Sequence, residues 1–504
     1  MQPQAESNAP YASGCTPQPD LPVVALAGGS GFVGTTLRIA LRHQYRWRAL
    51  TRSHTVAENS PSHDRDNTEW HECDLYSLPQ VEHSLRGAKY GIYLVHSMLP
   101  SSRLMQASFA DLDLLLADNF IRAAEAAGIE HVVYLGGLIP DEPELSPHLA
   151  SRLEVESVLR SRSVEVTVLR TGIIFGPGGS SMRMLINLVR RLPYMLLPTW
   201  TRSQAVSVDV RDIVRGFETV LAEPELQGGT YDIAGHDPMT YREMILRTAR
   251  YIKGREPKHI NLPFDLRPLS RLWVSLMSGV SGQLVGPLLE SLRHDLRASP
   301  NALQARIAPE AFHFEASLKH SVNDQGEPLP NPRSRTQGSD KKLIREARRV
   351  RSVQRMPLPK GWDAPMVADA YGYWLTKISL TVITVKRDEE GVIRFFMRLC
   401  SLKLLELTPT PYSRTGGRRR AFYISGGLLA RNPDPPGRFE FRIFPENGCL
   451  IAAVHGFVPR LPWRVYAWTQ ALVHIWVMRA FGRYLSVQEP AQDFVAASPN
   501  EARG

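Results

Sequence analysis

A short apolar segment that breaks into glycines places the strongest constraint on what this chain can fold into. Residues 23–34 read Val-Val-Ala-Leu-Ala-Gly-Gly-Ser-Gly-Phe-Val-Gly, and a helical pattern then continues to about residue 42. In the spacing G-x-G-x-x-G, one glycine allows the turn, one admits a pyrophosphate, and one lets helix and strand pack closely. The helix start also offers N–H groups to an anion. The segment predicts a dinucleotide site, rather than an ordinary glycine-rich turn, at Gly28, Gly29, Ser30, Gly31, Phe32, Val33 and Gly34.

Strand-like and helical segments alternate along the first three hundred residues. Strands are expected at residues 47–51, 70–75, 90–96, 131–135 and 164–170, and helices at 109–127, 147–160 and 180–191. Such alternation is typical of a parallel sheet covered by helices. It predicts an α/β domain with a Rossmann-type doubly wound parallel sheet over residues 21–322, with substrate-side segments at 180–300.

The ends of the expected strands bear on the cofactor. An Asp or Glu at the end of the second strand would bind the ribose 2′-OH of NAD, whereas an Arg accommodates the 2′-phosphate of NADP. The residue there is Arg52, which predicts NADP(H) in preference to NAD(H); the alternative is an ordinary solvated arginine. Later strand ends should line the same crevice. At these strand ends, Asp74 and Leu75 are predicted to contact the adenine of the cofactor. Val95, His96 and Ser97 are predicted as further cofactor-binding residues.

Several local strings, taken with the order of elements, resemble the short-chain dehydrogenase/reductase superfamily. They lie at residues 28–34, 74–75, 93–97, 134–137, 169–178, 206–212 and 231–235. Within the superfamily the chain is similar to the atypical, NmrA-like and sugar-epimerase-like reductases over about residues 21–300. The resemblance implies an NAD(P)-binding domain with reductase or isomerase activity.

The chain departs from that family where catalysis is expected. Catalytic members carry a Ser after the fifth strand and then a Tyr-x-x-x-Lys helix, in which the lysine lowers the pKa of the tyrosine. Here Gly136 or Gly137 stands in place of the Ser, and the helix carries His148-Leu-Ala-Ser-Arg152. Histidine can exchange a proton near neutral pH, and Arg152 on the same face could hold a ribose or phosphate oxygen. His148 and Arg152 are therefore the predicted catalytic pair; the alternative is a helix-start His and a surface Arg without function.

Apolar segments after residue 180 indicate where a substrate would bind. Residues 180–191 form an amphipathic helical pattern, and residues 192–200 are predicted to be an apolar loop. They indicate either a pocket for a small hydrophobic substrate or plain core. Residues 272–292 are nearly uncharged over the length of a membrane helix, but Pro287 and polar residues favour buried or interfacial helices over a span.

The C-terminal third has a different pattern. Residues 323–360 are predicted to be a linker that is first Pro-rich and then basic. Its positive charge indicates either a solvent-exposed surface or contact with anionic lipid. Strands are expected at 374–386, 419–424 and 438–444, with a hairpin turn at Asn447-Gly448, followed by a long helix at 465–485. These elements predict a smaller α+β domain over residues 361–488, weakly similar to helix-grip folds. The tryptophans on the helix fit a core better than a membrane interface.

Composition narrows the function classes. A formal charge of +10 suits anionic ligands or surfaces, but the basic segments lack the interleaved aromatics that favour nucleic-acid binding. Four separated cysteines predict neither disulfides nor a metal site. Residues 1–20 and 489–504 are expected to be a disordered leader and tail without a signal peptide. The predicted location is the cytoplasm, with peripheral contact to an anionic inner membrane face.

Two functional hypotheses from different classes follow. The first is an NADPH-dependent reductase or isomerase that acts on a small hydrophobic carbonyl-type substrate. The second is a non-catalytic NADP(H)-binding redox sensor, regulator or scaffold, which the missing Tyr and Lys would permit. The sequence leaves the substrate and the oligomeric state open.

Overall fold

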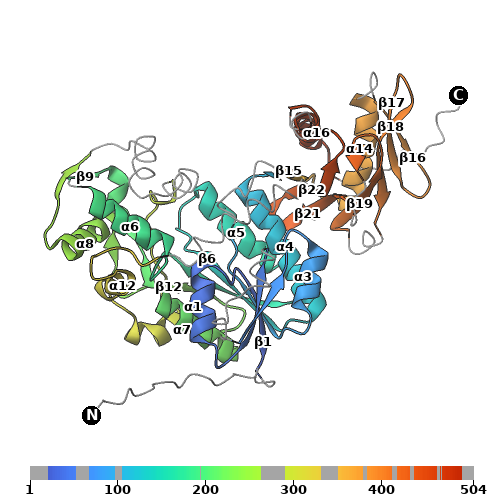
Figure 1. Ribbon diagram of the computed structural model, residues 1–504. Helices are drawn as coiled ribbons and strands as arrows, with labels where there is room; N and C mark the ends of the chain where they lie inside the picture. The colour runs from blue at the N-terminus through green and yellow to red at the C-terminus, as the bar shows by residue number, and fades with distance from the viewer. Residues whose placement is uncertain are drawn as a thin grey trace, which may run out of the picture.

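The computed structural model describes residues 21–52, 67–96, 105–192, 194–262, 290–330, 350–378, 383–410, 417–431, 436–462, 466 and 468–490. An N-terminal domain, coloured blue to yellow, lies beside a C-terminal domain, coloured orange to red (Figure 1). The predictions for the leader, Ser97, most of residues 272–292, the basic segment 341–349 and the tail from residue 491 fall outside the described residues.

Seven parallel strands form the sheet of the N-terminal domain, in the order β12-β7-β6-β4-β1-β2-β3. Their bounds are β1 Val23–Ala27, β2 Arg46–Thr51, β3 Thr68–Glu72, β4 Tyr90–Tyr93, β6 His131–Gly137, β7 Glu165–Thr171 and β12 Thr230–Ile233. The strand order reverses between β1 and β4, where ligands of open α/β sheets bind beyond the carboxyl ends of the strands. The predicted Rossmann-type doubly wound sheet is confirmed.

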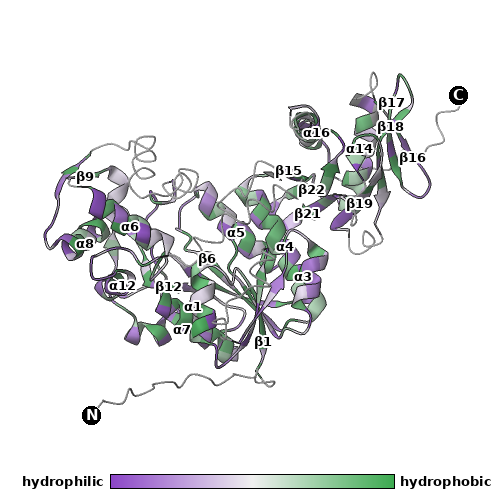
Figure 2. Cartoon of the chain, in the orientation of Figure 1, coloured by the Kyte–Doolittle hydropathy of each residue, from purple (hydrophilic) through white to green (hydrophobic). Residues whose placement is uncertain are grey.

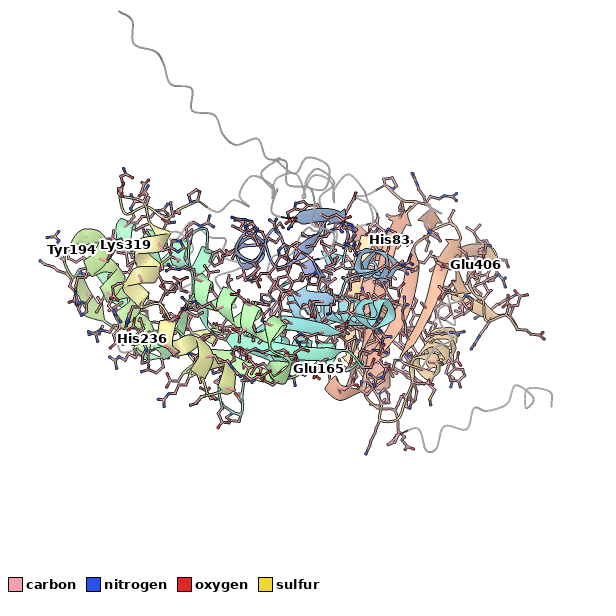
Figure 3. The ribbon with its side chains drawn as sticks, turned by 90° about the horizontal axis from the view of Figure 1, so that it is seen from below. His83, Glu165, Tyr194, His236, Lys319 and Glu406 are labelled. Carbon is pink, nitrogen blue, oxygen red and sulfur yellow. The ribbon has the colours of Figure 1, made fainter. Side chains whose placement is uncertain are left out.

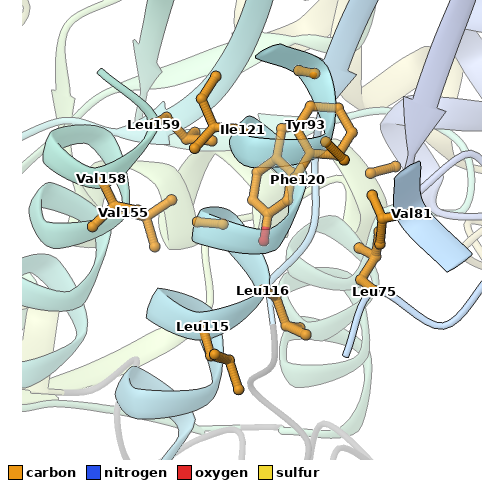
Figure 4. Packing of buried hydrophobic residues seen from close by; sticks show 14 of the residues in the cluster. Leu75, Val81, Tyr93, Leu115, Leu116, Phe120, Ile121, Val155, Val158 and Leu159 are labelled. Atoms are coloured by element: carbon orange, nitrogen blue, oxygen red, sulfur yellow. The ribbon is translucent and has the colours of Figure 1, made fainter. Parts of the chain in front are cut away.

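Helices cover both faces of this sheet. One face packs on α3 (Leu78–Leu85), α4 (Phe109–Ala127) and α5 (Pro147–Leu159), and the other on α1 (Phe32–Ala40), α7 (Val210–Ala222) and α11 (Ala302–Ile307). The Ser108 side chain caps the start of α4 by accepting the Asp111 N–H, and Gly128 ends the helix in the left-handed conformation. The apolar cluster between the sheet and helices α3, α4 and α5 is called the first core, and in it Phe120 of α4 packs on Tyr93 (Figure 4). Hydrophobic residues concentrate in the inner strands and in α4 (Figure 2).

Smaller elements after β7 pack around a separate apolar cluster. They are β8 (Ile173–Phe175), α6 (Ser180–Arg191), β9 (Tyr194–Leu197), β10 (Gln204–Ala205), β11 (Ser207–Asp209), β13 (Met239–Thr240), α8 (Tyr241–Lys253), β14 (Lys258–Asn261) and α12 (Phe314–Ser321). The helix predicted at 180–191 is confirmed. The loop predicted at 192–200 is wrong in part, because residues 194–197 pair as β9 with β14, a partner about sixty residues away that local composition does not reveal.

The C-terminal domain is built on a nine-stranded sheet with the order β16-β17-β18-β19-β21-β22-β15-β5, in which β20 pairs with β22. The strands are β15 (Val350–Pro357), β16 (Ile383–Arg387), β17 (Ile393–Met397), β18 (Leu402–Pro409), β19 (Arg419–Gly426), β20 (Ala430–Arg431), β21 (Arg438–Phe444) and β22 (Cys449–Pro459), with β5 (Met105–Gln106) from the N-terminal domain. The predicted strands at 419–424 and 438–444 and the hairpin at Gly448 are confirmed.

Two other predictions for this region are wrong. Residues 374–378, expected as strand, are the end of helix α14 (Ala364–Ile378), whose Trp374 packs into the core below the sheet. Residues 350–357, expected as linker, are β15, which pairs with β22 on one side and with β5 on the other. Helices α14 and α16 (Gln470–Leu485) cover one face of the sheet, and a helix-grip fold is not confirmed. No helix in the described part of the chain is long and apolar enough to cross a membrane.

The other face of the C-terminal sheet packs directly on the N-terminal domain. Along β22, Cys449, Ile451 and Ala453 join the core of α4 and α5, whereas Leu450 and Ala452 join the core of α14 and α16. Side chains alternate between the two faces of a strand, so this one strand contributes to both cores. The sheet therefore lies between the helices of the N-terminal domain and its own helices.

Candidate functional site

The glycine turn after β1 is shaped by close backbone contacts. Gly28 has φ 93°, a conformation that favours glycine, and a Cβ there would lie 3.1 Å from the Leu94 Cβ after β4. A Cβ on Gly34 would lie 2.5 Å from the Gly28 carbonyl oxygen, so this glycine lets α1 pack against the turn. A Cβ on Gly29 would lie 2.9 Å from that of Ala49 in β2.

Gly31 differs from these three glycines because a Cβ there would have a single close neighbour. Its backbone has φ −76°, and a Cβ would meet only the Gly28 carbonyl oxygen at 3.1 Å. Gly31 is also the N-cap of α1, where no side chain caps the helix and the first turn has no acidic residue. Ser30, Phe32 and Val33 beside it are half-buried. An open, uncapped helix N-terminus is suited to bind a phosphate, as the fingerprint predicts.

Arg52 is exposed directly after β2. Because β2 pairs in parallel with β1, with Leu50 opposite Ala27, the two strands end next to each other. Arg52 therefore lies at the edge of the sheet that carries the glycine turn, where a 2′-phosphate would be recognised.

The structure gives Asp74 and Leu75 other contacts than the predicted adenine. The Asp74 carboxylate pairs with Arg351 of β15 in the C-terminal domain and accepts the Tyr76 N–H at 3.1 Å. Leu75 is buried in the first core, and its carbonyl accepts a hydrogen bond from Asn119. This carboxylate already has partners, which the sequence could not show because Arg351 is far along the chain.

His96, predicted to bind cofactor, forms a hydrogen bond with a buried carboxylate. Its Nδ1 lies 2.6 Å from Oδ2 of Asp113 in α4, and Asp113 is 1% exposed. Burial and the nearby Arg152 lower the pKa of His96, although Asp113 opposes them. The other ring nitrogen, Nε2, is buried and has no hydrogen-bond partner in the part of the chain that the structure describes. Val95 beside it is half-buried against the first core.

The structure brings His148 to this pair. Its ring centroid lies 4.9 Å from that of His96, and its Nδ1 is also buried without a partner. Burial, with His96 and Arg152, lowers the pKa of His148 to about 3. Arg152 is held at the end of β6, where its guanidinium donates to the Leu135 carbonyl at 2.7 Å.

Asp113, His96 and His148 thus form a row of groups at the carboxyl ends of the strands. Asp113 was not among the predicted site residues; its signal in the sequence is a single carboxylate in the apolar run of residues 112–117. Near the carboxyl ends of these strands, three further buried polar atoms have no hydrogen-bond partner among the described residues. They are Tyr93 Oη, Ser151 Oγ and Thr171 Oγ1. Buried polar groups normally have partners, so these atoms fit a crevice that receives a polar ligand.

An apolar cavity of about 460 Å³ lies beyond the end of β6. Val206 and Leu296 line it and pack on Leu138, which follows Gly137. A Cβ on Gly137 would lie 3.8 Å from the Arg152 side chain, so the glycine pair links this cavity to the helix that carries His148. Four residues give the cavity wall polar or charged groups: Gln204, Ser207, Asp237 and Arg297. Such a mixture of apolar lining and few polar groups is typical of small-molecule sites.

One group of side chains in the described residues could hold a metal ion, although no metal site was expected from the sequence. His236, Asp237 and His313 place one ligand atom each within 4.8 Å of one another. Both histidines are exposed, and the second Asp237 oxygen accepts the Phe314 N–H at 2.7 Å. His236 lies at the end of the molecule opposite Glu406 of the C-terminal sheet (Figure 3).

Comparison with known proteins agrees with this architecture. Residues 22–225 match the model of the NmrA-like family. Ceramide reductase of Caulobacter vibrioides is 27% identical over 309 residues, which cover 60% of this chain and 93% of that protein. Auxiliary protein GraX of Staphylococcus aureus is 25% identical over 190 residues, 37% of this chain and 56% of that protein, so the match spans little more than half of its length.

Among solved structures, triphenylmethane reductase of Citrobacter sp. complexed with NADP(H) aligns with a TM-score of 0.48 and 16% identity, covering 60% of this chain and all of that one. The family match, the parallel sheet and the glycine turn agree on the N-terminal domain. Residues 22–225 are an NmrA-like domain of the atypical short-chain dehydrogenase/reductase type, and an antiparallel-sheet domain follows it in the same chain.

Proposed function

We propose that the protein is an NADPH-dependent reductase that acts on a small hydrophobic carbonyl-type substrate. The observation that carries the proposal is the row of Asp113, His96 and His148 beside the glycine turn. The apolar cavity beyond Gly137 supports a hydrophobic substrate. So does the likeness to ceramide reductase over 93% of that protein. NADPH, when bound, supplies the hydride for such a reduction.

The glycine turn and Arg52 are the residues that would hold the cofactor. The open face at Gly31 admits the pyrophosphate, the uncapped start of α1 donates N–H groups to it, and Arg52 pairs with the 2′-phosphate. The unpartnered polar atoms around His96 lie at the next strand end, towards which the rest of the cofactor would extend.

His148 has the role of a neutral hydrogen-bond donor in this proposal. Its low pKa keeps the imidazole uncharged at neutral pH, so it differs from the imidazolium acid that an unperturbed histidine would supply. The ring donates to the substrate carbonyl oxygen and gives its proton as that oxygen becomes a hydroxyl. Water returns a proton to His148, and the neutral ring of His96 beside it is held in orientation by the contact of its Nδ1 with the Asp113 carboxylate.

Turnover with a panel of quinones, enones and ketones tests the proposal. The purified protein should oxidise NADPH with at least one acceptor, and His148→Ala should lower kcat roughly a hundredfold or more, the typical share of a positioned proton donor. His83→Ala is the matched control, because His83 is exposed on α3 and should leave kcat unchanged (Figure 3). NADPH binding without turnover on any acceptor would instead favour a non-catalytic sensor, regulator or scaffold.

The pH profile of kcat tests the protonation state of His148. Because the pKa of His148 is lowered to about 3, its neutral form persists across the range where an ordinary histidine titrates. We expect kcat to stay level from about pH 5 to about pH 8 and to fall only in stronger acid. A limb near pH 6.5 that disappears in His148→Ala would contradict the neutral donor.

Arg52→Glu should shift cofactor preference from NADPH towards NADH. A carboxylate at this position repels the 2′-phosphate and can accept a hydrogen bond from the ribose 2′-OH. The expected change is at least tenfold in the ratio of the two Kd values, measured by fluorescence titration and corresponding to about 1.4 kcal/mol. Arg86→Glu, on an exposed arginine after α3, is the control for a general charge effect. If the ratio of the Kd values for NADPH and NADH is unchanged in Arg52→Glu, a group other than Arg52 binds the 2′-phosphate.

A further inference from the structure

Helix α16 presents large apolar side chains to the outside of the C-terminal domain. Trp468, just before the helix, is 79% exposed, and Leu472, Val473 and Trp476 are each more than half exposed. The opposite side of the helix is anchored, because Met478, Phe481 and Leu485 are buried in the core with α14. The exposed side chains therefore have no part in holding the fold together. Figure 1 shows α16 at the outer edge of this domain.

These side chains share one face of the helix with two arginines. With 3.6 residues per turn, Leu472 and Trp476 fall on one stripe of α16, and Arg479 and Arg483 continue it towards the end of the helix, whereas Trp468 lies just before the helix. Both arginines are exposed, and residues 470–485 contain no Asp or Glu. The face is therefore both apolar and positively charged.

We propose that this face of α16 docks on the surface of a membrane that contains anionic lipid. Tryptophan prefers the boundary between headgroups and acyl chains, and arginine on the same face pairs with lipid phosphates. The charge of the surface complements that of anionic lipid, and the formal charge of the whole chain, +10, acts in the same direction. A helix anchored by one side and lying flat needs no spanning segment, and it would hold the protein where hydrophobic substrates are concentrated.

Co-sedimentation of the full-length protein with vesicles tests the proposal. The protein should bind vesicles of phosphatidylcholine with phosphatidylglycerol, bind phosphatidylcholine alone at least roughly tenfold more weakly, and lose binding as salt is raised. Trp468→Ser with Trp476→Ser should weaken partition roughly tenfold or more, because two large apolar groups no longer insert. Arg479→Gln with Arg483→Gln should weaken it roughly thirty-fold on anionic vesicles only.

Ile39→Ser is the matched control, since Ile39 is an exposed apolar residue on α1 in the other domain. It should leave partition unchanged, and the thermal melt of each variant should match that of the parent protein. Failure of the parent to bind anionic vesicles would overturn the proposal. So would a dimer, seen by light scattering, that Trp468→Ser with Trp476→Ser dissociates, because the face would then belong to a second copy. Neither outcome bears on the reductase activity.

Discussion

Replacing Gly31 by aspartate should abolish NADPH binding while leaving the fold intact. Gly31 has φ −76°, which an L side chain can adopt, and a Cβ there would have one close neighbour, the Gly28 carbonyl oxygen at 3.1 Å, which must shift by a few tenths of an ångström. Aspartate is moreover a favoured N-cap residue, and its charge is favourable at a helix N-terminus. The same carboxylate would occupy the approach of the pyrophosphate and repel it. The expected loss of affinity exceeds roughly a hundredfold, which is about 3 kcal/mol.

The measurement is a titration with NADPH together with thermal unfolding of the apo protein. The midpoint of unfolding should stay the same or rise in Gly31→Asp. Gly34→Ala is the contrasting variant, because its Cβ would lie 2.5 Å from the Gly28 carbonyl oxygen and 2.8 Å from the Gly29 Cα. That variant should lower the unfolding midpoint. Retained NADPH binding by a folded Gly31→Asp protein would remove the glycine turn from the cofactor site.

Local signals in the sequence were sufficient for the glycine turn and for much of the N-terminal fold. The glycine spacing is visible locally, although Gly28 and Gly29 also pack on Leu94, after β4, and on Ala49 of β2, and α4 is specified by its cap and apolar period. Strand pairing in the C-terminal sheet was harder to predict, because β15 finds its partner β22 about a hundred residues away. The helical segment at 374–378 was mistaken for strand because its Trp, Leu and Ile residues are compatible with both the 3.6-residue period of a helix and the two-residue period of a strand.

The candidate site was predictable only in part for the same reason. His148 and Arg152 could be found from their spacing on one helix, and His96 from its position after a strand. The contact between His96 and Asp113 joins a strand end to a separate helix, and the Asp74 carboxylate meets Arg351 from another domain. Such contacts depend on tertiary packing, which the local sequence does not encode.

The helices that carry the candidate site also carry the contacts with the C-terminal domain. Arg355 of β15 bridges Asp111 of α4 and Glu154 of α5, with three nitrogen–oxygen distances of 2.6–2.7 Å. Asp113 is on the same helix as Asp111, and His148 is on the same helix as Glu154. The C-terminal domain therefore helps to fix the distance between α4 and α5. These helices provide Asp113 and His148, which lie on either side of His96 in the row.

A buried ion-pair network at this interface leads to the second large expected effect. Arg442 of β21 is fully buried and donates to Asp118 of α4 at 2.6 Å, to Asn119 at 2.7 Å and to Glu440 at 2.7 Å. Burial opposes ionisation of Glu440, but Arg419 and Arg442 hold its pKa well below the usual range. Both carboxylates therefore stay charged inside the interface and depend on their cationic partners.

Arg442→Met should lower the free energy of unfolding by about 3 kcal/mol, because removal of one partner leaves buried charge uncompensated. The estimate lies at the lower end for such pairs, since Asp118 keeps Arg122 and Glu440 keeps Arg419. Urea unfolding followed by circular dichroism measures the change. Arg394→Met is the matched control, because Arg394 also pairs with two carboxylates, Asp388 and Glu406, but at the surface, where solvent screening makes the expected loss much smaller. Equal losses in the two variants would mean that the buried network adds nothing to the stability of the domain interface.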